Sequence, residues 1–114
     1  STDGKHTDMH ASGFKKAEYE FKTGVAHGEW VFYYRNGKKR REINFLKGKA
    51  TGRSSYYNEK EELLSQVDFE NGKRAGKYMQ YFPAEKKVSI TGYFADNRKT
   101  SRWQYFTPNG AVLR

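Results

Sequence analysis

The stretch GEWVFYYRNGKKRREINFLKG, residues 28–48, contains the pattern from which the fold can be predicted. Four aromatic residues fall within the five positions from Trp30 to Tyr34. An Asn-Gly pair follows at Asn36 and Gly37, and then four consecutive basic residues. Asn-Gly is a strong signal for a β-hairpin turn, because both residues tolerate positive φ. The stretch therefore predicts a strand, a tight turn and a returning strand.

Weaker copies of this stretch recur along the chain at steps of 24, 24 and 25 residues. A degenerate copy, with His6 and Met9 in place of the aromatic pair, precedes them. A fixed period of this size is the signature of a repeat architecture. The recurring positions form five series: Gly28, Gly52, Gly76 and Ser101; Trp30, Ser54, Tyr78 and Trp103; Tyr33, Tyr57, Tyr81 and Phe106; Phe21, Phe45, Phe69 and Phe94; and Gly24, Gly48, Gly72 and Asn97.

Each unit is expected to reverse direction twice. The first turn is the hairpin tip, where Gly37 and Gly110 follow Asn, and where Glu61 and Glu85 replace the glycine. The second turn links successive units. Asn97 stands there in place of glycine, and Asn is the usual non-glycine residue for left-handed backbone, so the second turn is expected to need positive φ.

The strands between these turns show one apolar and one polar side. Ile43 and Phe45 alternate with Glu42 and Asn44, which predicts a strand with one buried and one wet face. Trp30 and Tyr33 are three positions apart, and a regular strand would point them to opposite faces. Either a bulge re-aims one of them or the strand is aromatic on both sides; we favour the bulge.

These patterns predict an all-β protein, an elongated stack of about four and a half β-hairpins forming one continuous antiparallel sheet. The aromatics of each hairpin are expected to pack between successive units. Residues 58–64 resemble a helix in composition, but the repeat places them at a hairpin tip. A single repeat domain, 1–114, is expected to comprise a degenerate unit over about 4–27, units over 28–51, 52–75 and 76–100, and a partial unit over 101–114.

The composition agrees with a thin, half-buried sheet. Only 35% of the residues are hydrophobic, yet 17% are aromatic, so about half of the apolar content is Phe, Tyr and Trp. No apolar run approaches the ~20 residues of a membrane-spanning helix, and we expect a soluble chain. The absence of cysteine excludes disulfides and thiolate zinc sites. The opening Ser1 is consistent with a processed product, which leaves the compartment open, an exported or cell-envelope location included.

No motif for catalysis is found. The three histidines, His6, His10 and His27, lack metal-ligand spacing and are expected in exposed turns. There is no Ser-His-Asp pattern, phosphate-binding glycine loop or dinucleotide fingerprint. We therefore expect no enzymatic activity, no catalytic residues, no metal, no cofactor and no small-molecule substrate.

The pattern GEWVFYYRNG, repeated as GKYMQYF and SRWQYFTPNG, resembles the MORN-repeat superfamily. It is similar in particular to the bacterial MORN-variant repeat, Gly-x-Trp-x-x-Tyr-x-x-x-Gly, which occurs in antitoxins of the YwqK type. The resemblance covers roughly residues 4–114. It implies a non-catalytic scaffold that binds another macromolecule, most often a protein, in an antitoxin-like or adaptor role.

Basic residues also recur at the repeat period. The formal net charge is +9, and several of the cations fall at the turns between units. Stacked hairpins would align them along one edge, where they could bind an acidic protein or, as the alternative, anionic phospholipid or nucleic acid. The simpler interpretation is that they keep the sheet soluble and block edge pairing. The candidate binding residues are Lys47, Lys49, Lys73, Arg74, Arg98 and Lys99.

Overall fold

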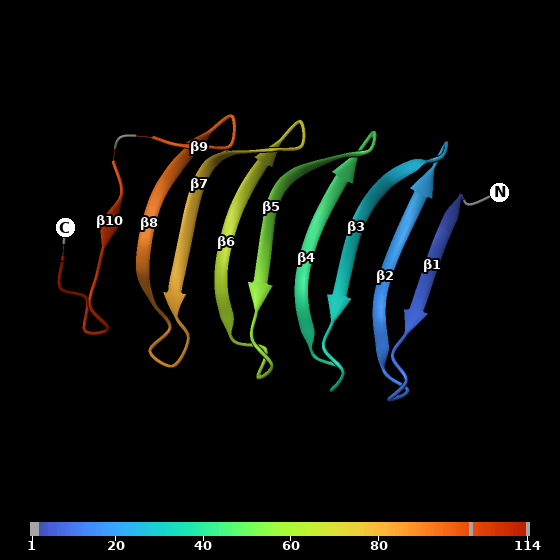
Figure 1. The fold of residues 1–114 in the computed structure, drawn as a ribbon, viewed down its shortest axis with the longest axis horizontal. Helices are drawn as coiled ribbons and strands as arrows, with labels where there is room; N and C mark the ends of the chain where they lie inside the picture. Colours follow the sequence, from blue (N-terminus) through green and yellow to red (C-terminus); the bar gives the residue numbers. More distant parts are fainter. Residues whose placement is uncertain (1–2, 101, 114) are drawn as a thin grey trace.

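A computed structural model describes residues 3–100 and 102–113 as one antiparallel sheet (Figure 1). Its strands follow one another in sequence order up to β8, which pairs with both β9 and β10. The strands are β1 (Gly4–Met9), β2 (Lys15–Lys22), β3 (Val25–Tyr33), β4 (Lys39–Leu46), β5 (Lys49–Tyr57), β6 (Leu63–Glu70), β7 (Lys73–Phe82), β8 (Lys87–Ala95), β9 (Arg98–Lys99) and β10 (Gln104–Tyr105).

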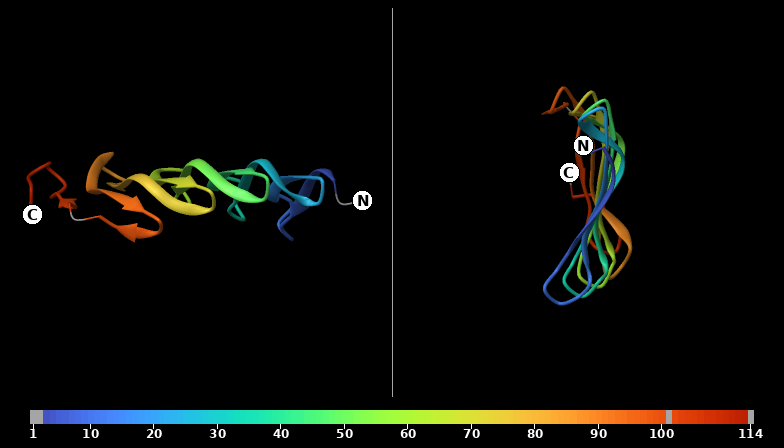
Figure 2. Two further views of the ribbon diagram at one scale, coloured as in Figure 1. Left: turned by 90° about the horizontal axis from the view of Figure 1, so that it is seen from above. Right: turned by 90° about the vertical axis from the view of Figure 1, so that its right-hand side faces the viewer.

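The sheet is open, elongated and only one layer thick. Its extents are 51 × 33 × 14 Å, and Figure 2 shows the strands as a twisted, curved slab. The described residues contain no helix, and the helix-like stretch at 58–64 forms a turn followed by the start of β6. The prediction of a continuous antiparallel sheet of stacked hairpins is confirmed. Ser101, predicted to continue the Gly28 series, lies outside the described residues.

The turns between units use left-handed backbone at two successive residues. Gly48 and Gly72 have φ of 83° and 81°, and Asn97 has φ of 68°, which confirms the need for positive φ. The residue before each of them is left-handed as well, with φ of 51° at Lys47 and 50° at Asp96. Positive φ at both central residues defines the type I′ turn, whose twist matches the twist of the flanking strands.

The hairpin tips have a different geometry from the one that Asn-Gly suggests. Gly37 is left-handed, with φ of 89°, but Asn36 is not. Tyr34 accepts a hydrogen bond from the Gly37 N–H and donates its own N–H to Lys38, as in a type I turn closed by a left-handed residue. The expectation of positive φ at both Asn and Gly is therefore wrong at this tip.

The tip residue that replaces glycine is predicted correctly in one unit. Glu61 has φ of 62°, whereas in the next unit the left-handed residue is Lys86, with φ of 57°, and not Glu85. The 25-residue step before the last unit explains the difference, because the additional residue moves the left-handed position one place along the chain.

Two kinds of bulge recur in the sheet. In β3, three residues beginning at Gly28 lie opposite Tyr19 alone, and Gly28 has φ of 70°. The second kind adds one residue to the returning strand: Arg40 lies between Arg41, which pairs with Phe32, and Lys39, which pairs with Tyr33. The pairing registers place the same extra residue at Lys16, Arg40, Leu64 and Ser89.

The favoured interpretation of the Trp30–Tyr33 spacing is wrong. The bulge near Tyr33 lies on β4, and the bulge of β3 ends at Trp30, so β3 runs regularly from Trp30 to Tyr33. Trp30 contacts Tyr19 on one face of the sheet, and the Tyr33 hydroxyl donates to Glu18 on the other. The strand is aromatic on both sides, which is the alternative that the sequence left open.

One face, which we call the aromatic face, carries the rings at the Trp30 and Phe45 positions. Trp30 lies 4.9 Å from Tyr19, 5.4 Å from Phe21 and 5.0 Å from Phe45, measured between ring centroids. Since Phe21 precedes the turn and Trp30 follows it, the rings do join successive units. They lie on the surface of a single sheet, however, and not between stacked layers. A second cluster joins Tyr78, Phe94 and Trp103, and pairing with Gly52 and Arg74 places Phe69 on the same face.

Ser54 separates the two ring clusters. Its side chain is fully buried, and its hydroxyl donates to the Glu42 carbonyl at 2.9 Å. The remaining core is aliphatic and thin. It consists of Ala17, Val31, Ile43, Ala50 and Val67, with Phe94 as the only ring among the buried hydrophobic residues that the structure describes.

Candidate binding surface

The turns between units all lie along one edge of the sheet, at the top of Figure 1. We call the cations at this edge the basic rim. The predicted alignment of these residues is present, because the turns follow β2, β4, β6 and β8 in spatial order. Every member of the rim is exposed. The rim consists of Lys22, Lys47, Lys49, Lys73, Arg74, Arg98 and Lys99.

The rim divides between the two faces of the sheet. Lys49 pairs with Leu46, and Lys73 pairs with Glu70. Each of these pairs is next to a pair whose side chains point to the aromatic face. Because side chains alternate along a strand, Lys49 and Lys73 point to the opposite face. We call this the polar face. Arg98 follows the same alternation, since it pairs with Ala95. Lys47 lies in the turn itself.

Arg74 and Lys99 point to the aromatic face and contact rings there. The Arg74 guanidinium lies 4.3 Å from the centre of the Phe94 ring and donates to the Asn97 carbonyl at 3.1 Å. The Lys99 ammonium lies 4.7 Å from the centre of the Trp103 ring. These two predicted binding residues therefore also stabilise the fold.

The rim cations are not neutralised by the ion pairs found among residues 3–100 and 102–113. Those pairs join Lys15 to Glu18, Lys39 to Glu42 and Arg53 to Asp68. All three lie away from the turns between units. The rim thus presents positive charge to solvent; Glu20, Glu70 and Asp96 are the carboxylates nearest to it in the sequence, and the Asp3 carboxylate binds the backbone of the first turn.

The polar face carries a second repeating set, which the sequence analysis did not identify. The Tyr57 hydroxyl donates to Glu42 at 2.7 Å, and Lys39 pairs with the same carboxylate at 3.2 Å. Tyr33, Glu18 and Lys15 repeat this arrangement one unit earlier. Tyr81 and Gln66 form an uncharged version one unit later. The Arg40 bulge explains the arrangement, because it turns Lys39 to the face of Glu42.

These contacts shift the pKa values of both partners. Burial and the hydrogen bond to Glu18 raise the pKa of Tyr33 to about 12. Burial and the hydrogen bond to Glu42 likewise raise the pKa of Tyr57 to about 12. The Tyr33 and Tyr57 hydroxyls, with help from Lys15 and Lys39, lower the pKa of the Glu18 and Glu42 carboxyls. The set therefore favours neutral tyrosine and ionised glutamate. Its sequence signal is a Tyr that follows a Glu by 15 residues in two successive units.

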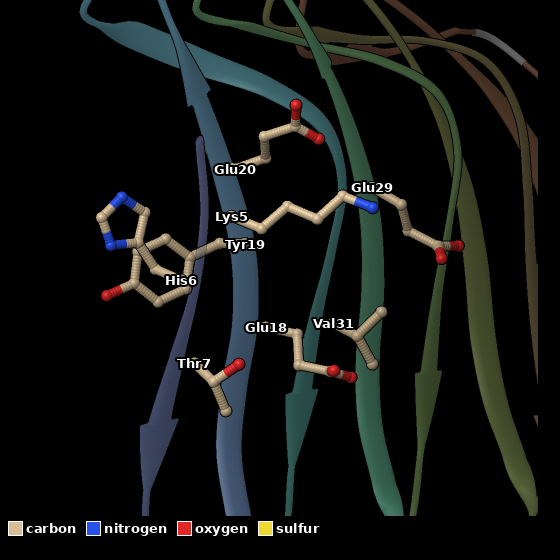
Figure 3. A pocket seen from close by; sticks show the side chains of 8 residues that line it. All are labelled: Lys5, His6, Thr7, Glu18, Tyr19, Glu20, Glu29 and Val31. Atoms are coloured by element: carbon tan, nitrogen blue, oxygen red, sulfur yellow. The ribbon is translucent and has the colours of Figure 1, made fainter. Parts of the chain in front are cut away.

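A shallow hollow lies over β1, β2 and β3 (Figure 3). In Figure 3 the Lys5 side chain extends toward Glu29, with Glu20 to one side of it and Glu18 to the other. Glu18 is already bound by Tyr33 and Lys15. Among the described residues, no group of three or more His, Cys, Asp or Glu is placed to hold a metal ion.

His6 and His27 lie in strands and not in the exposed turns that the sequence suggested; His10 begins the first hairpin-tip turn but is half-buried. His6 is in β1 and stacks on Tyr19 at 5.4 Å. The His10 ring lies within hydrogen-bond distance, 3.0 Å, of the Tyr33 carbonyl. His27 is in β3 and pairs with Glu20. All three are half-buried, because each occupies a position that the repeat uses for unit-to-unit contact.

Comparison with known proteins leaves the family open. No protein-family model matches the chain, and no curated protein matches it either. Across residues 3–100 and 102–113, the structure contains no helix with the length and apolar character needed to cross a membrane.

Proposed function

We propose that this chain is a non-catalytic repeat scaffold that binds an acidic protein through the basic rim. The observation that carries the proposal is the alignment of exposed cations from successive units along one edge of the sheet. A net charge of +9 adds a long-range attraction for acidic partners.

The geometry of the rim suits recognition of a regular acidic surface. Neighbouring strands are about 4.8 Å apart, so equivalent residues in successive units lie about 10 Å apart. Two left-handed residues fix each turn, which limits the backbone entropy that binding would cost. Lys49 and Lys73 are equivalent residues that point to the same face, and Arg98 continues the row.

As part of this proposal, we assign the chain to the MORN-variant class, and the repeat supports that assignment. Gly-x-aromatic-x-x-Tyr recurs in register, and each copy forms the same strand and bulge. An antitoxin-like or adaptor role follows from that resemblance. In such a role the partner would be neutralised or held, without chemistry on the scaffold.

A second candidate is peripheral binding to anionic phospholipid. Two exposed apolar side chains, Val25 and Leu46, lie beside Lys22 and Lys47 at the rim. Apolar and cationic groups side by side are what a membrane surface binds. Vesicles that contain phosphatidylserine test this candidate, because a lipid-binding rim would adsorb them in a salt-sensitive way.

The test of the protein-binding proposal is co-purification from the native host. The rim variant combines Lys47→Glu, Lys49→Glu and Lys73→Glu, and it omits Arg74 because that residue packs on Phe94. The control variant combines Lys38→Glu, Lys60→Glu and Lys87→Glu, which makes the same charge change at the hairpin tips.

We expect the rim variant to lose the partner and the control variant to keep it. Both should keep the far-ultraviolet spectrum and the melting temperature of the unmodified chain. Retention of the partner by the rim variant, or equal loss from both variants, would contradict the proposal.

A further inference from the structure

A hollow on the aromatic face has features that the repeat does not explain. It lies between β7, β8 and the C-terminal segment, and its volume is about 200 Å³. Its lining includes Arg74, Tyr78, Phe94, Lys99, Trp103 and Tyr105. Gln80 and Ile90 complete the lining, so no carboxylate contributes to it.

The hollow depends on one departure from the repeat. The Trp103 ring lies directly on Gly92, where an added Cβ would come within 2.3 Å of the indole Cδ2 atom. In the earlier units Tyr19, Ile43 and Val67 occupy the position equivalent to Gly92. Only a glycine lets the indole ring approach the strand this closely. Trp103 is fixed further by its N–H, which donates to the Tyr93 carbonyl at 3.2 Å.

The walls of the hollow are flat rings. Trp103 stacks on Tyr78, with centroids 5.3 Å apart and planes inclined by 29°. Phe94 meets Trp103 edge-on at 5.1 Å. Aromatic surfaces of this kind accept planar rings by stacking.

Two cations stand at the hollow in defined positions. Asn97 accepts hydrogen bonds from two nitrogens of Arg74, at 3.4 Å and 3.1 Å, which leaves further N–H donors of the guanidinium for a ligand. The Lys99 ammonium lies over the Trp103 ring. Because no carboxylate lines the hollow, the complementary ligand is an anion attached to a flat ring.

The pairing of cation and ring continues along the same face. Arg41 lies 5.0 Å from the centre of the Tyr56 ring, and Arg40 lies 5.8 Å from the centre of the Phe32 ring. Successive rings with interleaved cations form the platform on which single-stranded nucleic acid binds, with bases on the rings and phosphates on the cations.

A membrane fits this face less well. Its rings pack against one another, several of them edge-on, and are half-buried or buried, whereas exposed hydrophobic residues such as Val25, Leu46 and Tyr93 lie beside the rim or on the polar face. We propose that the aromatic face binds single-stranded nucleic acid and that the hollow holds one nucleotide, with its phosphate at Arg74 and Lys99. This site shares Arg74 and Lys99 with the rim, but it lies on the aromatic face, whereas Lys49 and Lys73 point to the polar face.

The two tryptophans provide the test, because one lies in the hollow and the other in the N-terminal ring cluster. The Trp30→Phe chain reports on Trp103 alone, and the Trp103→Phe chain reports on Trp30 alone. The probe is a 5′-phosphorylated thymidine dinucleotide, followed by oligothymidylate. We expect the dinucleotide to quench Trp103 fluorescence and to leave Trp30 unchanged. No change at Trp103, or equal quenching of both, would overturn the proposal.

Charge variants separate this site from the rim. Lys99→Gln removes a cation whose contact is with the Trp103 ring, so the fold should survive; Arg74→Gln is the second variant. Each should weaken oligothymidylate binding roughly tenfold, as expected for one charge-assisted contact. The matched variants Lys47→Gln and Lys49→Gln should bind normally.

If the rim and hollow variants weakened oligothymidylate binding equally, the loss would be explained by net charge alone. That result would overturn the proposal. So would a polyglutamate peptide of the same charge that quenched Trp103 with equal affinity, since the hollow would then take an acidic protein. Neither result bears on co-purification through Lys47, Lys49 and Lys73, so the two proposals can fail separately.

Discussion

At the scale of single residues, left-handed backbone decides which side chains the turns between units can carry. Each of these turns has two successive positive φ values, as at Asn71 and Gly72, with φ of 51° and 81°. A left-handed conformation costs an ordinary residue roughly 1–2 kcal/mol, less for Asn and nothing for Gly. Gly or Asn at the second position therefore removes a cost that would otherwise be incurred in every unit.

Substitution of Gly72 tests this requirement. An added Cβ would meet Lys49 at 3.7 Å, an ordinary contact, so space is not the obstacle. We expect Gly72→Asn to cost less than about 1 kcal/mol and Gly72→Val about 2 kcal/mol or more, because β-branched residues avoid positive φ. Chemical denaturation of the two variants measures the difference. Equal stabilities would show that no left-handed residue is needed at this turn.

The paired tyrosines and glutamates of the polar face give the stability a dependence on pH. The pKa of Tyr57 is about 12 in the folded chain and near 10 in the unfolded chain. Its stabilisation is therefore complete below pH 10 and is lost as the pH rises toward 12. The pKa of Glu42 is lowered in the folded chain, so its stabilisation is present above the ordinary pKa of 4.5 and is lost as the pH falls below it.

Removal of two hydroxyls tests the linkage. The double variant Tyr33→Phe and Tyr57→Phe should lose about 1 kcal/mol per hydrogen bond at neutral pH. Its melting temperature should also depend less on pH at both the acidic and the alkaline limit. Tyr81→Phe is the control, because its partner Gln66 does not ionise. An unchanged pH profile in the double variant would show that these contacts are absent in solution.

At the scale of strands, the turn residues and the repeat predict the hairpins, but the bulges follow from contacts across the sheet. Gly, Asn and the 24-residue step are local signals, and they are sufficient to place every hairpin. Arg40 and Lys16 have nothing in their side chains that identifies them as bulge residues. Their role is evident only when Lys39 and Lys15 meet the carboxylates of Glu42 and Glu18. The face of Tyr33 follows the regular alternation of β3, and the sequence left it open because it does not show whether a bulge lies on β3 or on β4.

The aromatic face makes a prediction at this scale that compares two equivalent positions. Trp30 contacts rings from β2 and β4, so Trp30→Ala should destabilise the chain by about 3 kcal/mol. Ser54 holds the same repeat position but is fully buried, so Ser54→Trp should overpack the site and cost about 2 kcal/mol. Thermal melts measure both variants. A stabilised Ser54→Trp chain would show that the site is open enough to accept a ring.

At the scale of the whole molecule, hydrogen bonds at both edges link each unit to the next. The Gly48 and Gly72 N–H groups donate to the carbonyls of Ala26 and Ala50 in the preceding unit. At the first turn, where the described chain has no earlier unit, the Asp3 carboxylate accepts from Thr23 and Gly24 instead. These bonds hold the rim turns in register, and so they set the spacing of the cations.

The position of the rim could be predicted from the sequence, but the division of its members could not. The repeat alone places Lys49 and Lys73 at equivalent turns. The contact of Arg74 depends on Phe94, which lies in another strand, and the contact of Lys99 depends on where the Trp103 ring lies. The hollow beside them depends on Gly92, where earlier units carry a larger side chain. The sequence does not show why glycine stands there, because the reason is that the Trp103 ring lies on it.

The most direct test of the central claim, that the rim is the binding surface, is amide chemical-shift mapping with the co-purified partner. The uniformly labelled chain is titrated with that partner, and perturbed amides are assigned along the sequence. We predict that the largest changes fall at the turns between units, over 22–25, 46–49 and 70–74, and that they diminish as salt rises. Changes concentrated at the hairpin tips, over 34–38 and 58–62, or spread along the aromatic face, would contradict the claim.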